Sequence, residues 1–183
     1  MPIPSEQESQ AITINRGLYK MGYSGEQFCY DIELPEHSVY LNDYKIDAYP
    51  ITNKQYIKFV EDGGYDDFKY WLSDGWDKIQ GEKWKAPMYW EKIDGEWMTC
   101  DFLGKREINP NEPVCHVSYY EAMAFCKWKG GSLPKESQWE YLSTFFEESS
   151  LEPLVILVIL VNVLFLSPGL ILSGLYPQKK SLL

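Results

Sequence analysis

The chain has 183 residues, a length that suits one ordinary domain. It carries 17 Lys and Arg against 27 Asp and Glu, so its formal net charge at pH 7 is −10. Proteins that bind nucleic acids need clustered cations to neutralise phosphates, and this charge balance argues against that class. Aromatic residues make up 16% of the chain, whereas acidic disordered segments are poor in them, so most of the length is predicted to fold.

The composition changes abruptly near residue 150. All seven tryptophans lie before residue 140, and no Asp, Glu, Lys or Arg lies between Pro153 and Gln178. Residues 151–175 hold 17 Leu, Ile, Val or Phe in 25 positions, which is long and apolar enough to span a bilayer. Lys179 and Lys180 fit a cytoplasmic flank of such a span.

The same tail also fits a shifted reading frame that replaced the rest of a domain with an unselected peptide. Pro168 and Gly169 in the middle of the apolar run favour this second interpretation. In both cases the chain divides into a leader (1–11), a partial domain (12–148) and a hydrophobic tail (149–183). A membrane partner is expected only through the tail, and the location is otherwise predicted to be cytoplasmic.

Short strands are predicted over residues 12–49, where β-branched and aromatic residues alternate with turn residues. A helix follows, because Thr52 or Asn53 can cap it and Tyr56, Phe59 and Val60 recur at helical spacing. Two glycines at 63–64 are expected to end this helix.

Residues 65–111 show no dominant period. The pairs Asp74-Gly75 and Asp94-Gly95 are turn signals, and large aromatic residues are spread between them. We therefore predict little regular structure here, with loops held together by clusters of aromatic side chains.

Two helices are predicted near the end of the partial domain. Ser118 and Glu121 form a capping-box pattern, and the helix that follows should end at Gly130-Gly131. A further helix is expected over 134–146, because proline suits its first turn and Trp139 begins an apolar stripe along it.

Four spaced motifs carry a resemblance to a known family. They are residues 49–53 (YPITN), 59–65 (FVEDGGY), 113–122 (PVCHVSYYEA) and 133–140 (LPKESQWE). Together they resemble the formylglycine-generating-enzyme type of domain. Within that superfamily, residues 71–76 (WLSDGW) and 86–90 (APMYW) are more similar to the sulfoxide synthases of ergothioneine biosynthesis.

The resemblance implies an α+β fold, loop-rich and C-type-lectin-like, of which this chain holds the first half followed by an apolar segment. It also implies a non-heme iron(II) enzyme that uses O2 to join a cysteine-containing thiol to a trimethylated histidine. In that family the iron ligands are histidines of a separate helical domain, and later motifs of the fold should follow residue 146. This chain has two histidines and lacks those motifs, so we expect it to bind no iron and to be inactive alone. Lys135 also stands where the family has a threonine helix cap.

The residues themselves suggest few catalytic candidates. His37 and His116, with Asp43 or Asp47, have the residue types of a facial iron triad, but lone histidines are more often structural. Cys115 or Cys126 is a second candidate, as a reactive thiol.

Cys126 falls on the apolar face of its predicted helix, which favours a place in the core. None of the four cysteines forms a C-x-x-C pair, so free thiols in a reducing compartment are expected. We assign no catalytic, cofactor-binding or metal residue.

The aromatic residues of 65–97 have two interpretations. They fit a cleft for a quaternary ammonium group, and they also fit the core of a loop-rich domain. We favour the core, because little else in this region is apolar.

Two other functions stay open for the chain. One is a non-catalytic or membrane-tethered binding module, and the other is a truncated formylglycine-generating oxidase.

Overall fold

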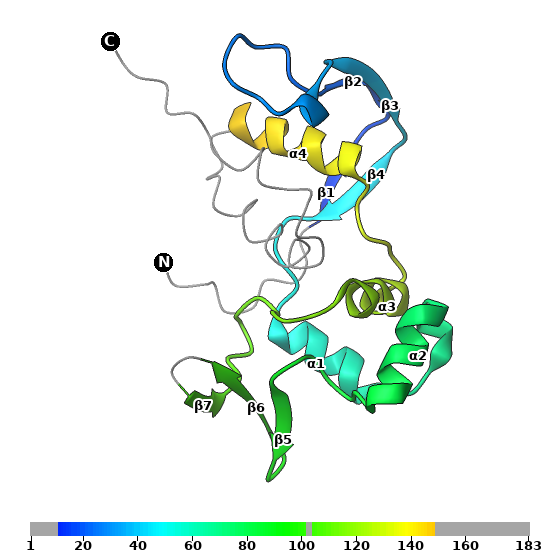
Figure 1. Cartoon of the computed structure of the whole chain (residues 1–183), viewed down its shortest axis with the longest axis vertical. Helices are drawn as coiled ribbons and strands as arrows, with labels where there is room; N and C mark the ends of the chain where they lie inside the picture. The colour runs from blue at the N-terminus through cyan, green and yellow to red at the C-terminus, as the bar shows by residue number, and fades with distance from the viewer. Residues whose placement is uncertain (1–10, 102–103, 149–183) are drawn as a thin grey trace.

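The computed structural model describes residues 11–101 and 104–148, which form an α+β domain with three small sheets (Figure 1). The N-terminal strands and the last helix make up one part of the domain. The other helices and a three-stranded sheet make up the second part. The predicted α+β, loop-rich fold is confirmed.

Four short antiparallel strands begin the fold, as predicted. Strand β1 (Ala11–Ile14) pairs with β4 (Tyr44–Asp47), and β2 (Gly17–Met21) pairs with β3 (His37–Leu41). A short 3-10 turn, η1 (Asp31–Glu33), lies in the loop between β2 and β3.

Helix α4 (Glu136–Glu148) covers the second of these strand pairs (Figure 1). The backbone N–H of Gly22 donates to Glu140 Oε1 at 2.6 Å, and the ring centroids of Tyr19 and Tyr141 lie 3.8 Å apart. A small apolar cluster around Ile14 and Leu142 results from this packing. The predicted helix over 134–146 is therefore present and begins two residues later.

The two capped helices form where the sequence predicts them. Helix α1 (Asn53–Glu61) begins with a capping box between Thr52 and Gln55. Helix α3 (Tyr119–Lys129) begins with the predicted box between Ser118 and Glu121 and ends at Gly130, whose φ of 83° a residue with a Cβ rarely adopts.

The prediction of little regular structure over 65–111 is wrong. This region contains η2 (Phe68–Tyr70), α2 (Ser73–Glu82) and the antiparallel sheet of β5 (Trp90–Ile93), β6 (Glu96–Asp101) and β7 (Gly104–Glu107).

The two Asp-Gly pairs behave differently. Asp94-Gly95 is a turn, with φ of 50° and 93° in the two-residue loop between β5 and β6. Asp74-Gly75 lies inside α2, where Gly75 is buried against α3. A Cβ built on Gly75 would lie 2.6 Å from the Cβ of Tyr120. The glycine is therefore explained by close packing of two helices and not by a turn.

The main core is aromatic and lies among α1, α3 and the segment that precedes α2. Tyr56, Phe59 and Tyr65 are at most 1% exposed, and the rings of Tyr56 and Phe125 stack at 5.1 Å. Trp71 is buried too and donates its indole N–H to the carbonyl of Gly64 at 2.7 Å. The core interpretation of these aromatic residues is confirmed, although Phe68 and Tyr89 are exposed.

The predictions for residues 1–10 and for the tail from 149 onward lie outside the described residues. Within the described part of the chain, no helix is both long enough and apolar enough to cross a membrane.

Candidate functional site

A groove of about 440 Å³ lies between the two parts of the domain. Strand β4, the residues that lead into α1, one face of α3 and the segment 130–138 line it. Its walls are mostly apolar and include Ile46, Ile51, Val114, Val117, Phe125 and Pro134. Such a surface suits an apolar occupant, and no catalytic group stands out on it.

The lining of the groove also includes polar side chains, among them Asp47, Cys126 and Lys129. Lys129 Nζ lies 2.7 Å from Asp47 Oδ2, joining α3 to β4 across the groove. Burial raises the pKa of the Cys126 thiol to about 11, with Lys129 opposing and Asp47 adding to the shift. A thiol with this pKa is a poor nucleophile at neutral pH. Cys126 therefore lines the groove without acting as a reactive group. Cys126 is half-buried, whereas the sequence favoured a place in the core.

A buried polar cluster links α1 to α3. The hydroxyl of Tyr65 donates a short hydrogen bond to Glu121 Oε1, and the backbone N–H of Ser118 donates to Glu121 Oε2 at 2.7 Å. The hydroxyl of Tyr56 lies 3.5 Å from that of Tyr65. Burial raises the pKa of Glu121, and hydrogen bonds from Tyr65 and Ser118 partly oppose this.

Burial also raises the pKa of both tyrosines well above its usual value. Glu121 is only 2% exposed and both tyrosines are 1% exposed, so the cluster is part of the packing that holds the helices together. The sequence showed Glu121 only as a helix cap, and nothing in it marked the contact with Tyr65.

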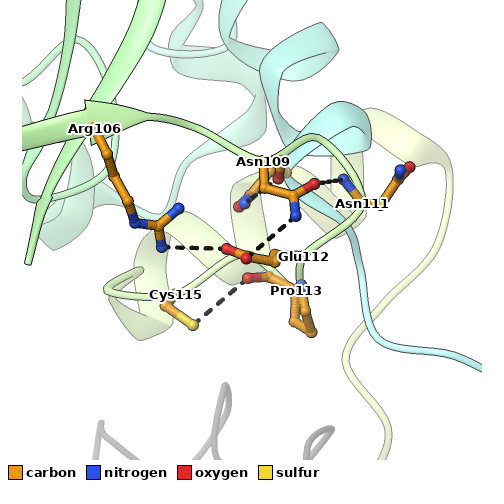
Figure 2. A network of polar contacts seen from close by, with 7 residues as sticks. Arg106, Asn109, Asn111, Glu112, Pro113 and Cys115 are labelled. Carbon is orange, nitrogen blue, oxygen red and sulfur yellow. Dashed lines mark hydrogen bonds and ion pairs between the residues drawn. The ribbon is translucent and has the colours of Figure 1, made fainter. Parts of the chain in front are cut away.

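A polar network fixes the loop that leads to α3 (Figure 2). Glu112 accepts from Arg106 Nη2 at 3.3 Å and from Asn109 Nδ2 at 3.2 Å. The carbonyls of Pro110 and Glu112 in turn accept from the first N–H groups of α1, those of Lys54 and Asn53. The loop therefore satisfies the free donors of a helix N-terminus. The backbone N–H of Val114 also donates to the carbonyl of Ile51 at 2.9 Å, which joins the motif at 113–122 to the motif at 49–53.

Cys115 belongs to this loop and is held by it. Its thiol donates to the carbonyl of Pro113 at 3.5 Å, as Figure 2 shows. Partial burial of the sulfur and then the nearby carboxylate of Glu112 raise the pKa of Cys115. These contacts favour the protonated thiol, so the structure offers nothing that would activate Cys115.

The structure does not bring the two histidines into one site. His37 Nδ1 lies 2.9 Å from the carbonyl of Pro35, and the ring of His116 meets that of Tyr89 edge-on at 5.0 Å. Asp43 accepts from the backbone N–H of Arg16.

No group of three His, Cys, Asp or Glu side chains within residues 11–101 and 104–148 is placed to hold a metal ion. The described residues therefore do not fit an iron centre, and the facial-triad interpretation has no geometric support.

One feature near His116 has no signal in the sequence. His116 and Tyr89 both have left-handed backbone conformations, with φ of 60° and 69°, and both are exposed. Residues other than glycine rarely adopt this conformation. The side chains of His116 and Tyr89 also contact each other. Histidine is enriched in this conformation compared with most residues other than glycine, whereas a bulky tyrosine is not, so the sequence gives no sign of Tyr89.

These observations define a loop-rich α+β domain with two capping-box helices, an aromatic core and an apolar groove. The chain belongs to the sulfatase-modifying factor enzyme 1-like domain family, whose sequence profile matches residues 1–144.

Among similar proteins, the hercynine oxygenase of Mycolicibacterium smegmatis is 32% identical over 145 residues, which cover 76% of this chain and 33% of that protein. The hercynine oxygenase of Mycobacterium tuberculosis is 37% identical over 110 residues, covering 60% of this chain and 25% of that protein. The formylglycine-generating enzyme of Bos taurus is 29% identical over 145 residues, covering 73% of this chain and 39% of that protein. The chain therefore spans a quarter to a third of the hercynine oxygenases it matches.

Proposed function

We propose that this chain is the first part of the C-terminal domain of an O2-dependent sulfoxide synthase that acts on hercynine, a trimethylated histidine. The second substrate is a cysteine-containing thiol, and the bond formed joins its sulfur to the histidine ring. The similarity to hercynine oxygenases, 32% over 145 residues and 37% over 110, carries this proposal.

The two motifs that resemble the sulfoxide synthases have structural roles in this part of the domain. In 71–76, Trp71 is in the core and Trp76 packs against it. In 86–90, Pro87 is fully buried and Trp90 packs against Tyr56. The resemblance thus concerns a scaffold, which agrees with a chain that supports a site without containing the reacting groups.

The chain alone is inactive under this proposal. Its described residues offer no three-ligand metal group, and its share of the relatives' length leaves room for an iron-binding part elsewhere. The test measures the iron content of the purified chain after loading with Fe(II), and its O2 uptake with hercynine and a cysteine-containing thiol.

We expect iron well below one equivalent and O2 uptake no faster than in buffer with free Fe(II). The M. smegmatis hercynine oxygenase is the positive control. Stoichiometric iron together with O2 uptake that needs both substrates would refute the proposal.

A second candidate is a truncated formylglycine-generating oxidase that acts on a cysteine of a sulfatase. The similarity to such enzymes supports it, since the chain spans 39% of the Bos taurus protein at 29% identity. A sulfatase-type cysteine peptide separates the candidates, because mass spectrometry detects its conversion to formylglycine. Aldehyde formation by this chain, without reaction of hercynine, would favour the second candidate.

The domain limits and the location are part of the proposal as well. We place the partial domain at 12–148, after a leader and before the apolar tail, and we place the protein in the cytoplasm. Resequencing the DNA across codons 140–160 tests the tail: later family motifs in another frame would support the frameshift. A frame without them, together with recovery of the chain in membranes, would support the membrane-tethered module.

A further inference from the structure

The loop between β2 and β3 exposes several large apolar side chains that are close together in the sequence. Over residues 28–34 they are Phe28, Tyr30, Ile32 and Leu34. Phe28 is 80% exposed and Ile32 is 67% exposed. Single exposed apolar residues are common on protein surfaces, whereas groups of them mark interaction sites. We call these four residues the loop patch.

Hydrogen bonds hold the loop that carries the loop patch. The backbone N–H of Tyr23 donates to the carbonyl of Glu33 at 2.8 Å, and the backbone N–H of Gln27 donates to the hydroxyl of Tyr23 at 2.9 Å. The rings of Phe28 and Tyr30 meet edge-on with their centroids 5.2 Å apart. The loop patch is therefore a defined surface on which another segment can pack.

The same loop is acidic. Residues 22–36 contain no Lys or Arg and four acids, Glu26, Asp31, Glu33 and Glu36. Glu36 pairs with Lys20 at 2.9 Å. Oε1 of Glu33 is buried and finds no hydrogen-bond partner among the described residues. Leaving a buried acceptor unpaired costs free energy, so the loop suits an occupant that brings cationic donors together with apolar side chains.

The hydrophobic tail of this chain has the complementary composition. Residues 151–175 hold 17 Leu, Ile, Val or Phe in 25 positions, and the first charges after Pro153 are those of Lys179 and Lys180. The groove offers these lysines less, because the one acid in its described lining is Asp47, which already pairs with Lys129. The loop patch therefore matches the tail better than the groove does.

The tail also begins near enough to reach this loop. The backbone N–H of Gly22, where the loop starts, donates to Glu140 Oε1 at 2.6 Å, and α4 ends at Glu148. The helix rises about 12 Å between Glu140 and Glu148, and each extended residue beyond it spans about 3.3 Å. In the view of Figure 1, the loop and the C-terminal end of α4 lie on the same side of the strands. A few residues after α4 therefore suffice to bring the apolar run to the loop patch.

We propose that the hydrophobic tail, residues 149–183, folds back on its own domain and covers the loop patch. Its apolar run packs on Phe28 and Ile32, and its lysines meet the acids of the loop. A tail joined to its target by a short linker acts at an effective concentration of about 1 mM, so it outcompetes a second copy of the chain at micromolar concentration. The family profile ends at residue 144, so this contact lies outside the matched domain. It goes beyond the proposed function and involves neither iron nor turnover.

Cys29 gives a direct readout, because it is half-buried and lies between Phe28 and Tyr30. The full 183-residue chain is treated with N-ethylmaleimide, and peptide mass spectrometry follows the modification of each cysteine. The same measurement is made on Leu157→Asp/Leu164→Asp, which places two carboxylates in the apolar run.

Ser149→Asp/Ser150→Asp adds the same charge before the apolar run and is the matched control. A tail held at about ten times its Kd leaves the loop patch uncovered about a tenth of the time. Cys29 should therefore label about tenfold faster in the variant of the apolar run than in the parent or the control. Cys126, which lines the groove, and exposed Cys100 should label equally in all three chains.

A second pair of variants changes the loop instead of the tail. Phe28→Ser/Ile32→Ser replaces exposed side chains of the loop patch, so the buried cores are unaffected. Thermolysin should cleave the tail several-fold faster in this variant than in the parent. Leu18→Ser/Tyr40→Ser removes an exposed apolar cross-strand pair of β2 and β3 outside the loop, and it should leave the cleavage rate unchanged.

Five results would overturn the proposal. Equal labelling of Cys29 in the parent and in the variant of the apolar run would show that the tail does not cover the loop patch. Protection of Cys126 instead would place the tail in the groove. Protection of Cys29 that is lost on about hundredfold dilution would show a second copy as the occupant. Recovery of the parent chain with phosphatidylcholine vesicles, with Cys29 unprotected, would place the tail in a membrane. Equal thermolysin cleavage in the loop variant and the parent would refute the contact even where the tail variant unfolds. None of these results depends on whether the chain has the proposed activity.

Discussion

Two glycines of α2 provide a matched test of how this helix packs. Gly75 is buried against Tyr120, and an added Cβ would lie 2.6 Å from both Cβ and Cγ of that residue. Gly81 lies in the same helix, and an added Cβ there would meet nothing within 4 Å. Neither glycine has a positive φ, so alanine is compatible with the backbone at both positions.

Replacing either glycine by alanine gains about 0.5–1 kcal/mol from the lower conformational freedom of the unfolded chain and the higher helix propensity of alanine. Gly81→Ala should therefore raise the free energy of unfolding by about that amount. In Gly75→Ala the new methyl group forces α2 away from α3, and overpacking of this kind costs roughly 1–3 kcal/mol. Since the propensity gain is common to both variants, their difference isolates the steric cost.

Urea unfolding followed by tryptophan fluorescence measures both variants against the parent chain. We expect Gly75→Ala to be less stable than Gly81→Ala by about 1–3 kcal/mol, the full steric cost. Equal stabilities, or a stabilised Gly75→Ala chain, would refute the close contact of α2 with α3.

Three further predictions use the same unfolding assay. Ser118→Ala removes the side-chain acceptor at the start of α3 and should lower the free energy of unfolding by about 1 kcal/mol. Ser118→Thr keeps the oxygen and should lower it less, so equal losses of stability in the two variants would contradict the cap. Lys83 ends α2 with a left-handed φ of 58°, which glycine adopts without strain. Lys83→Gly should therefore raise the free energy of unfolding by about 1 kcal/mol, and a lower value would contradict the strain. Burial raises the pKa of Glu121 in the folded chain, so the carboxyl keeps its proton to a higher pH there than in the unfolded chain. The contribution of Glu121 to stability therefore falls as the pH rises through the folded pKa. Because Gln does not titrate, the parent chain should lose stability relative to Glu121→Gln as the pH rises above the ordinary glutamate pKa of about 4.3, and the opposite trend would contradict the assignment.

The parts of the fold that the sequence predicted are those fixed by local contacts. The caps of α1 and α3 are hydrogen bonds between residues three apart, so Ser118 and Glu121 identify a helix start without any tertiary information. The turn at Asp94-Gly95 is local in the same way, because two adjacent positive φ angles favour this dipeptide.

The parts that the sequence did not predict depend on distant contacts. Helix α2 has two apolar residues among its ten, Trp76 and Ile79, and contains two glycines, so its pattern is weak. It forms because Ile79 is buried in the core and Gly75 allows approach to Tyr120, 45 positions along the chain. The groove is likewise a product of segments that are far apart, since Asp47 of β4 and Lys129 of α3 form an ion pair across it. No spacing in the sequence reveals such a pair.

The two apolar clusters of the domain differ in size. Among the described residues, the cluster around Phe59 and Phe125 has nine buried members, whereas the cluster of the N-terminal strands has two, Ile14 and Leu142. Burial supplies most of the favourable free energy of folding, so the strands contribute little stability of their own and rely on α4. Those strands include β4, all four residues of which line the groove. Within the described residues, the part of the domain with the smaller buried cluster thus forms one wall of the groove, and the main core forms the opposite wall through Val117 and Phe125.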